Sequence, residues 1–168
     1  MRIFKETQRF NQWWLQLINI GLIILLLFLL YTWFVAKDAV DKVSANDTTG
    51  QIIVIASIVP VLILIFTLKL KTSIDEVGIH YQFFPFHLSK KTIRWNDIEK
   101  CYVRTYSPIK EYGGWGYKTS FGERGKALNV RGDKGVQIEF KTGEKLLIGT
   151  QKEAEASQVI TRNFNNLT

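Results

Sequence analysis

Glycine, aromatic and cationic residues gather in one segment, EYGGWGYKTSFGERGKALNVRGDKG (residues 111–135), and this mixture raises the question of phosphate binding. A nucleotide-binding P-loop has the spacing G-x-x-x-x-G-K-[ST], because backbone amides, a lysine and a hydroxyl must converge on phosphates and magnesium. Here Gly125-Lys126 is followed by Ala127, and Ser120 stands where the first glycine is required. The dinucleotide-binding spacing G-x-G-x-x-G fails as well, and no βαβ pattern surrounds the segment. We therefore expect no nucleotide site.

Residues for metal binding or nucleophilic catalysis are few. The histidines are His80 and His87, which lie seven positions apart across a proline, and the single cysteine, Cys101, is distant from both. Metal sites need clustered His, Cys or carboxylate ligands, and nucleophilic catalysis needs a base and an orienting group beside Ser or Cys. No local pattern supplies either set, so we expect a protein without enzyme activity, metal or cofactor, although a constellation assembled in space stays open.

The glycine-rich segment has the composition of a contact surface. Exposed aromatic residues with nearby arginine are typical of interface hot spots, and glycine gives the backbone the freedom to present them. We expect four aromatic anchors and a rim of cations to bind a partner protein or a second copy of the chain. This partner-binding set comprises Tyr112, Trp115, Tyr117, Phe121, Lys110, Lys118 and Arg124.

The positive charge of the chain suggests an alternative partner. The formal net charge is +7, and most of the excess lies after Lys69. Cations attract both anionic lipid and nucleic acid, but no known nucleic-acid motif is present, so lipid is the expected partner class. The alternative function is recognition of anionic lipid headgroups by a basic face that comprises Lys90, Lys91, Arg94, Lys126 and Arg131.

Two uncharged apolar runs near the N-terminus are expected to anchor the protein in a membrane. Residues 13–36 span roughly 36 Å as a helix, at about 1.5 Å per residue, and residues 51–68 span roughly 27 Å, so both are long enough to cross a bilayer. We expect transmembrane helices at about residues 13–36 and 51–70. A cleaved signal peptide is the rival interpretation of the first run, but the run is long for one, and Phe34 disrupts the small-residue pattern before Ala36. Neither run contains an ionisable residue, so no ion pathway is expected.

Cations set the expected orientation. The segment before the first run carries three, and Lys69 and Lys71 directly follow the second. The connecting loop, residues 37–50, holds two lysines beside three aspartates and is poorest in positive charge. By the positive-inside rule the loop faces outward, and both termini face the cytoplasm.

The first twelve residues, MRIFKETQRFNQ, show helical spacing. Ile3, Thr7, Phe10 and Trp14 fall on one helical face, with cations on the others. We interpret this segment as an interfacial helix that lies at the headgroup level, with a partner-binding helix as the alternative.

After Lys71 the pattern changes to short alternating segments. Turn signals separate seven expected strands: 69–75, 79–84, 88–94, 98–106, 127–131, 136–141 and 144–148. Thr150 and Glu153 form a capping-box pattern before an amphipathic helix. The chain is thus expected to divide into an N-terminal membrane part, residues 1–71, and a cytoplasmic part, residues 72–168, in which the helix closes the open end of a small antiparallel barrel.

Three stretches of this domain carry a family resemblance. DEVGIHYQF (75–83), IRWNDIEKCYV (93–103) and KGVQIEFKTGEKLLIGTQK (134–152) resemble bacterial pleckstrin-homology-like (PH-like) membrane proteins that have an N-terminal transmembrane hairpin. SPIKEYGGWGYK (107–118) is similar to the Bacteroidetes-type variant. The resemblance covers the whole chain, but its motifs are structural. It implies a PH-like domain at the bacterial inner membrane and a scaffold or interaction role.

One departure limits what the resemblance implies. Eukaryotic domains of this superfold often bind phosphoinositides through basic residues in the first hairpin. The corresponding turn here, Asp75-Glu76-Val77-Gly78, is acidic, which argues against carrying that lipid site over to this chain.

Overall fold

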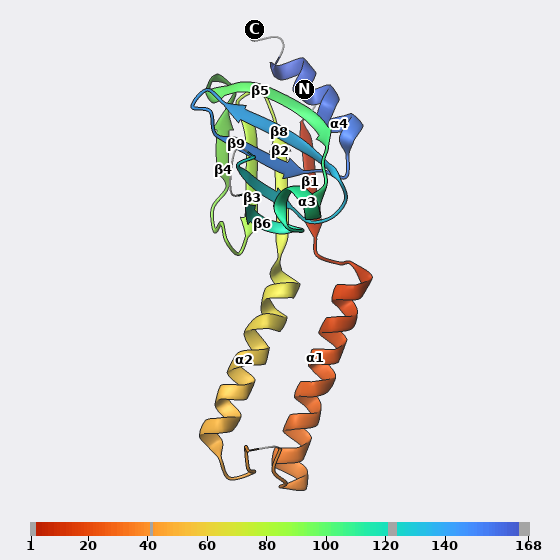
Figure 1. Cartoon of the computed structure of the whole chain (residues 1–168), viewed down its shortest axis with the longest axis vertical. Helices are drawn as coiled ribbons and strands as arrows, with labels where there is room; N and C mark the ends of the chain where they lie inside the picture. The colour runs from red at the N-terminus through yellow and green to blue at the C-terminus, as the bar shows by residue number, and fades with distance from the viewer. Residues whose placement is uncertain (1–2, 41, 121–123, 165–168) are drawn as a thin grey trace. The chain divides into compact units, whose positions relative to one another are not determined.

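The computed structural model describes residues 3–40, 42–120 and 124–164 (Figure 1). The chain divides into two compact units. One, the helical unit, is Phe10–Thr67; the other, the β unit, combines Met1–Arg9 with Leu68–Thr168. The helical unit is thus inserted into the sequence of the β unit, between its first and second strands.

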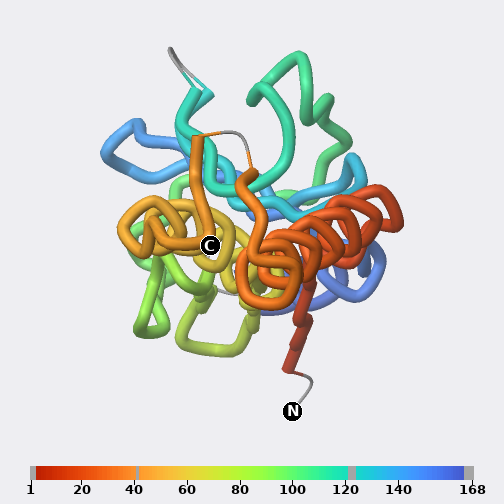
Figure 2. The backbone as a smooth tube through the Cα atoms, turned by 90° about the horizontal axis from the view of Figure 1, so that it is seen from below, coloured from red at the N-terminus to blue at the C-terminus, as the bar shows by residue number. Residues whose placement is uncertain are grey.

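The helical unit contains two long apolar helices. α1 is Trp13–Tyr31 and continues as a π-helical segment, Thr32–Ala36, while α2 is Thr48–Thr67 and has Pro60 inside it. The helices lie side by side (Figure 2). Asp47 caps α2, since its carboxylate accepts a hydrogen bond from the Gly50 amide (3.0 Å).

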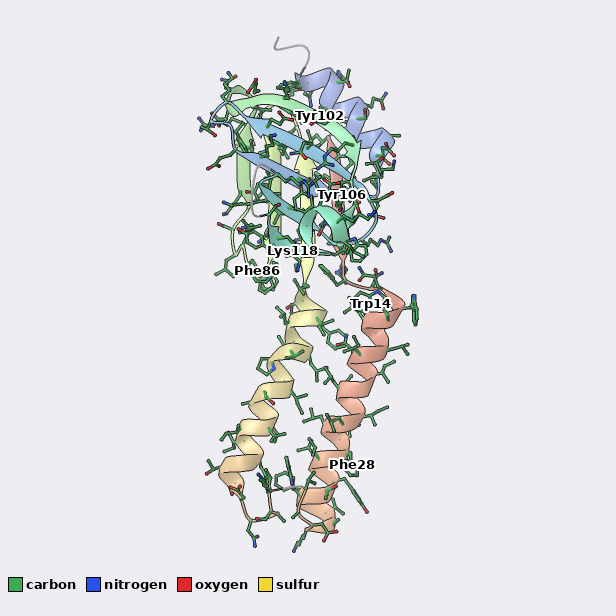
Figure 3. All side chains as sticks on the ribbon, viewed as in Figure 1. Trp14, Phe28, Phe86, Tyr102, Tyr106 and Lys118 are labelled. Carbon is green, nitrogen blue, oxygen red and sulfur yellow. The ribbon has the colours of Figure 1, made fainter. Side chains whose placement is uncertain are left out.

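Both helices are long and apolar enough to cross a membrane. Their large apolar side chains are mostly exposed, and Trp14 and Phe28 project outward from α1 (Figure 3). Contiguous apolar surface of this extent is unfavourable in water and favourable in lipid. The prediction of two apolar helices is therefore confirmed, and the second begins at Thr48 rather than at residue 51.

The first sheet of the β unit is antiparallel throughout, and among the described residues its strand order is β1-β2-β3-β4. These strands are β1 (Phe4–Arg9), β2 (Lys69–Ile74), β3 (Gly78–Phe84) and β4 (Lys91–Arg94). Three of the expected strands correspond to β2, β3 and β4, although β4 begins three residues later than predicted.

The interfacial helix expected in the first twelve residues is wrong. Residues 4–9 form β1, in which Phe4, Glu6 and Gln8 are buried and the intervening residues are exposed. A segment this short satisfies the helical period and the two-residue period alike, and the edge of β2 decides between them by supplying a ladder of backbone hydrogen bonds. The folded β unit therefore includes residues 4–9 and does not begin at residue 72.

The second sheet is mixed, with the strand order β5-β8-β9-β7-β6 in the described part of the chain. Its strands are β5 (Ile98–Thr105), β6 (Gly116–Thr119), β7 (Lys126–Asn129), β8 (Lys134–Phe140) and β9 (Lys145–Gly149). β7 pairs with β9 in parallel, and the other pairs are antiparallel. The last four expected strands are present, but the antiparallel arrangement expected throughout fails at β7.

The helix α4 (Glu153–Phe164) follows the last strand as expected, and it buries Ala156, Val159 and Ile160. The expected capping box is wrong. The Thr150 hydroxyl donates to the buried carboxylate of Glu6 (2.7 Å) and accepts from the Lys152 amide (3.1 Å), and the helix begins only at Glu153. The hydroxyl thus accepts from an amide that precedes the helix, and its own proton is donated to Glu6 of β1.

The core of the β unit draws aliphatic and aromatic side chains from both sheets. The largest fully buried ones include Leu70, Ile74, Ile79, Phe83, Leu128, Ile138, Leu147 and Ile148. Trp95 is also buried: its indole nitrogen donates to the Asp75 carbonyl (2.9 Å) and its ring packs near Phe164 of α4.

Candidate functional site

The glycine-rich segment begins with a short helix, α3 (Pro108–Tyr112). Proline occupies its first turn, and the Glu111 carboxylate accepts a hydrogen bond from the Ser107 amide (2.7 Å). Gly113 ends the helix with a φ of +70°, a left-handed conformation that glycine adopts without strain. Its amide bonds back to the Ile109 carbonyl (2.9 Å), so the sequence stops the helix where the glycines start.

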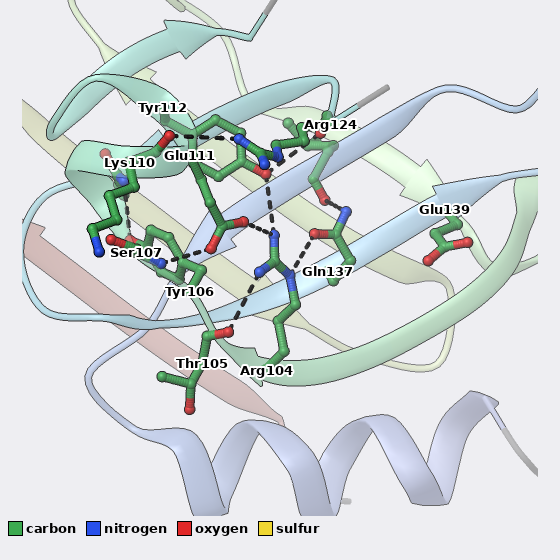
Figure 4. A network of polar contacts seen from close by, with 12 residues as sticks. Arg104, Thr105, Tyr106, Ser107, Lys110, Glu111, Tyr112, Arg124, Gln137 and Glu139 are labelled. Carbon is green, nitrogen blue, oxygen red and sulfur yellow. Dashed lines mark hydrogen bonds and ion pairs between the residues drawn. The ribbon is translucent and has the colours of Figure 1, made fainter. Parts of the chain in front are cut away.

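Arg104 of β5 ties α3 to the second sheet (Figure 4). Its Nη2 donates to the Glu111 carboxylate (2.8 Å), and its Nε donates to the Gln137 side-chain oxygen of β8 (2.9 Å). The hydrogen bond from Arg104 is the main cause that lowers the pKa of Glu111, and it outweighs the opposing effect of burial. This ion pair is a structural clamp that fixes the path of the glycine-rich segment.

Tyr112 is buried, so the prediction that it is an exposed anchor is wrong. It belongs to a buried cluster with Tyr106, Ala127 and Leu147, and the two tyrosine rings meet edge to face with centroids 6.0 Å apart. Burial raises the pKa of the Tyr112 hydroxyl, which contacts the Arg124 carbonyl (3.4 Å). The turn of α3 points this side chain inward, so the start of the glycine-rich segment packs on the second sheet.

Trp115 and Tyr117 lie at the surface of the β unit. Trp115 is partly exposed, and its indole nitrogen donates to the Gly132 carbonyl (3.0 Å). Tyr117 belongs to β6, which pairs with β7 and turns part of the expected loop into an edge strand. The Gly116 amide donates to the Asn129 side chain (2.8 Å) and fixes the start of that strand. Phe121 lies outside the described residues.

Tyr117 stacks on an aromatic residue from the connection between β3 and β4 of the first sheet. Its ring centroid lies 5.7 Å from that of Phe86, and Phe86 stacks in turn on the buried Phe83 at 5.7 Å. His87 meets Tyr117 edge to face at 5.6 Å. Phe86 is 56% exposed and Tyr117 is 39% exposed. We call this exposed pair the aromatic patch; it joins the β3–β4 connection to β6.

The ring of His87 favours its neutral form. Burial is the main cause that lowers its pKa, and the nearby charge of Lys91 lowers it further. A neutral imidazole packs edge to face against an aromatic ring without the cost of burying a charge. His87 is therefore part of the support beneath the aromatic patch.

The expected rim cations are placed unequally. Lys110 lies exposed on α3, and Arg124 is exposed and donates to the Lys110 carbonyl (3.5 Å). Lys118 lies beside Tyr117 on β6 and is half-buried. One arginine and one lysine of the expected rim thus contact each other, and the second lysine is adjacent in sequence to the aromatic patch.

The expected lipid-binding cations are all exposed but divide between the two sheets. Lys90, Lys91 and Arg94 lie on or next to β4 of the first sheet. Lys126 lies on β7 of the second sheet, and Arg131 lies in the turn after it. The basic face expected from the sequence therefore draws its cations from both sheets.

His80 and Cys101 are two of the residues whose types could support metal binding or catalysis. His80 lies between the Asp75 carboxylate and the Thr92 hydroxyl, at 2.8 Å from each. Burial raises the pKa of the Cys101 thiol to about 12, so it stays protonated near neutral pH. The described residues contain no group of three or more acidic, histidine or cysteine side chains placed to hold a metal ion.

Phe86 is the main residue of this site that sequence reasoning missed. It follows Pro85 in a segment that looks like a simple strand break, and its partner Tyr117 lies about thirty positions away in the other sheet. An exposed aromatic residue beside a proline was the available signal, but only the pairing of the elements shows where it stacks.

Comparison with models of known protein families gives no match for this chain, and comparison with curated proteins gives none either.

Proposed function

We propose that this protein is a non-catalytic, membrane-anchored interaction protein that recruits or stabilises a partner protein at the cytoplasmic face of a bacterial inner membrane. The observation that carries the proposal is the aromatic patch, in which Phe86 and Tyr117 stack on buried support while much of their surface remains open to solvent. Aromatic side chains that are already held in place lose little conformational entropy on binding, so they make effective anchors.

The fold supports a PH-like assignment of the β unit. Two packed sheets followed by a C-terminal helix match the expectation, and α4 contributes three buried side chains. Two features depart from a simple antiparallel barrel: the parallel pairing of β7 with β9, and a helical unit inserted between β1 and β2. We propose a PH-like domain that is modified at these two places.

The surroundings of the aromatic patch favour a protein partner. Trp115 is also partly exposed, and the same glycine-rich segment carries exposed cations, including Arg124. Interfaces are enriched in Trp, Tyr, Phe and Arg at their centres, and the exposed residues of the aromatic patch and of the glycine-rich segment include all four types. A lipid surface would instead be contacted through cations and scattered apolar residues, and that outcome is included in the test below.

Site-specific photo-cross-linking tests the proposal in native membranes. A photoreactive phenylalanine analogue replaces Phe86, and the matched control carries it at Val77, which is 60% exposed in the β2–β3 turn. We expect a discrete protein adduct at position 86 that is absent at position 77. The additional substitution Tyr117→Ser should remove that adduct, because it removes the ring against which the residue at position 86 stacks.

Two results would contradict the proposal. One is cross-linking at position 86 to lipid alone. The other is a protein adduct of equal yield at positions 86 and 77, which would indicate random collision. Adducts with a second copy of the chain, recognised by their mass, would support an interface and identify the partner as the protein itself.

The second candidate function is recognition of anionic lipid headgroups. Lys90, Lys91, Arg94, Lys126 and Arg131 are exposed, and none forms an ion pair with another described residue. A photoactivatable phosphatidylglycerol in reconstituted vesicles should label the wild type more than a variant with all five changed to Gln. Labelling that is equal in the two proteins contradicts this candidate.

A further inference from the structure

A pocket opens on the outer face of the first sheet, and it uses none of the residues of the aromatic patch. Its volume is about 310 Å³. Lys5 and Thr7 of β1, Lys71 and Ser73 of β2, and Lys90 before β4 contribute to its lining. His80 of β3 lies at its side and is oriented by Asp75 and Thr92.

The strand register explains why these side chains meet. Lys5 pairs with Ser73, and Ser73 pairs with His80 on the next strand. Thr7 pairs with Lys71 in the neighbouring row. Directly opposed residues of antiparallel strands project to the same face, so two adjacent rows combine lysines with hydroxyl groups. The pocket exists only because residues 4–9 form a strand.

The charge in this pocket is not balanced by the described residues. Lys5, Lys71 and Lys90 form no ion pair with any of them. Glu6 also contributes to the lining, but its carboxylate is already bonded to the Thr150 hydroxyl (2.7 Å) and the Gln151 amide (2.8 Å). Three ammonium groups around one hollow repel one another, and a bound anion would remove that repulsion.

We infer that this pocket binds a phosphate-bearing ligand. A phosphate group offers several strong acceptor oxygens, and lysine ammonium groups and hydroxyls are donors suited to it. The volume accommodates a phosphate together with a few further heavy atoms, as in a glycerophosphate unit. The flexible lysines Lys5, Lys71 and Lys90 supply the charge, and Thr7 and Ser73 supply short, directional donors.

Two sources could present this chemistry: a lipid headgroup and a soluble phosphate ester. The row formed by Arg9, Lys69 and Phe84 is where the chain leaves the sheet toward α1 and α2. Lys71 lies two residues after Lys69 along β2, which is about 7 Å at the usual rise of a strand. A headgroup source therefore rests on the proposed membrane anchorage, whereas a soluble source does not.

Lysine acetylation footprinting of the full-length protein tests the inference. The protein in phosphate-free detergent is acetylated alone, with phosphatidylglycerol, with glycerol 3-phosphate, or with chloride at equal ionic strength, and each lysine is quantified by mass spectrometry. Lys100 and Lys141, which are exposed and lie outside the pocket, serve as internal controls. We expect slower acetylation of Lys5, Lys71 and Lys90 in at least one phosphate arm, with the controls unchanged.

Substitutions separate a binding site from general screening. Lys71→Gln should lower the affinity for the ligand by about ten-fold, the usual effect of losing one charge-assisted hydrogen bond. The ligand should therefore protect Lys5 and Lys90 less from acetylation. Lys100→Gln is the matched control and should leave protection intact. An unchanged melting temperature for both variants shows that the fold is retained.

The arms of the experiment distinguish the outcomes. Protection by phosphatidylglycerol alone identifies a lipid headgroup, and protection by glycerol 3-phosphate identifies a soluble phosphate ester. No protection beyond the chloride arm overturns the inference, as does equal protection of Lys100 and Lys141. Protection that survives Lys71→Gln overturns it as well. None of these results depends on the cross-linking outcome at Phe86.

Discussion

At the scale of single residues, Arg104 organises the candidate site. Its guanidinium contacts Glu111 on α3 and Gln137 on β8, and it lies 5.9 Å from the centre of the Tyr106 ring. Burial by itself would lower the pKa of Arg104, but its interactions with Glu111 raise it. One side chain thus links α3 to two strands, and α3 decides which aromatic residues of the glycine-rich segment turn inward.

Replacing Glu111 tests this clamp through pH dependence. The folded-state pKa of Glu111 is lowered below its ordinary value of 4.5, so the folded protein binds this proton less readily than the unfolded chain does. Its stabilising contribution is therefore present above that value and is lost as the pH falls through the folded-state pKa. Glu111→Gln should lower stability by about 1 kcal/mol at pH 7, a modest effect because the pair is partly exposed.

The measurement is thermal unfolding of the detergent-solubilised protein between pH 7 and acidic pH. The difference in melting temperature between the wild type and Glu111→Gln should become smaller as the pH falls below the ordinary glutamate pKa. Glu99→Gln, on the exposed side of β5, is the matched control and should follow the wild type. A gap that stays constant with pH would show that the Arg104–Glu111 ion pair does not hold α3.

At the scale of elements, β1 connects three parts of the β unit. It pairs with β2, its Gln8 side chain donates to the Gly149 carbonyl at the end of β9 (2.7 Å), and its Glu6 carboxylate accepts from the residues that precede α4. A strand that is separated from its partner by the whole helical unit thus fastens the first sheet to the C-terminal helix.

Glu6→Ala should therefore destabilise the β unit. The substitution leaves the Gln151 amide without its acceptor and removes the charged acceptor of the buried Thr150 hydroxyl. Losing hydrogen bonds to a buried charged group costs about 2–4 kcal/mol. Thr7→Ala, at the next and exposed position of β1, should cost less than about 0.5 kcal/mol. Chemical denaturation of both variants in detergent measures the difference; equal stability would show that β1 is not a structural part of the unit.

The elements also show how far the sequence could predict this fold. Apolar and β-branched runs bounded by turn residues identify the strands after residue 68 with the exception of β6, which lies in the segment expected to be a loop. β1 was missed because six residues fit both periods, and its partner lies about sixty positions away. α3 had a readable signal, Ser107-Pro108 before Glu111 and Gly113, but short helices depend on tertiary contacts such as the Arg104 bond.

The candidate site was less predictable than the fold. Tyr112 and Tyr117 flank the same glycines, yet one is buried and the other is exposed. The spacing of residues cannot distinguish them, because the turn of α3 and the pairing of β6 decide which way each ring points. The pocket on the outer face of the first sheet could not be predicted for the same reason. Lys5 lies beside Ser73 only when residues 4–9 form a strand.

At the scale of the whole molecule, the pairing of β1 with β2 constrains the topology. These strands come immediately before and after the helical unit in the sequence, and they fold together in one sheet. If α1 and α2 both cross the bilayer, the chain crosses it twice between these strands, which returns β2 to the side of β1. Cleavage after α1 would remove β1 from the domain, so the structure favours a retained anchor over a signal peptide.

Cysteine accessibility tests the side on which each part lies. Thr48→Cys places a thiol at the start of α2, next to the connecting loop, and Lys100→Cys places one on the exposed side of β5. The native Cys101 contributes little background, because burial raises its pKa to about 12 and the thiolate is the reactive form. In intact cells an impermeant thiol reagent should label position 48 and spare position 100, and permeabilisation should expose position 100 to the reagent. Labelling of position 100 alone in intact cells would reverse the orientation, whereas labelling of both positions would mean that the helices do not separate them by a membrane.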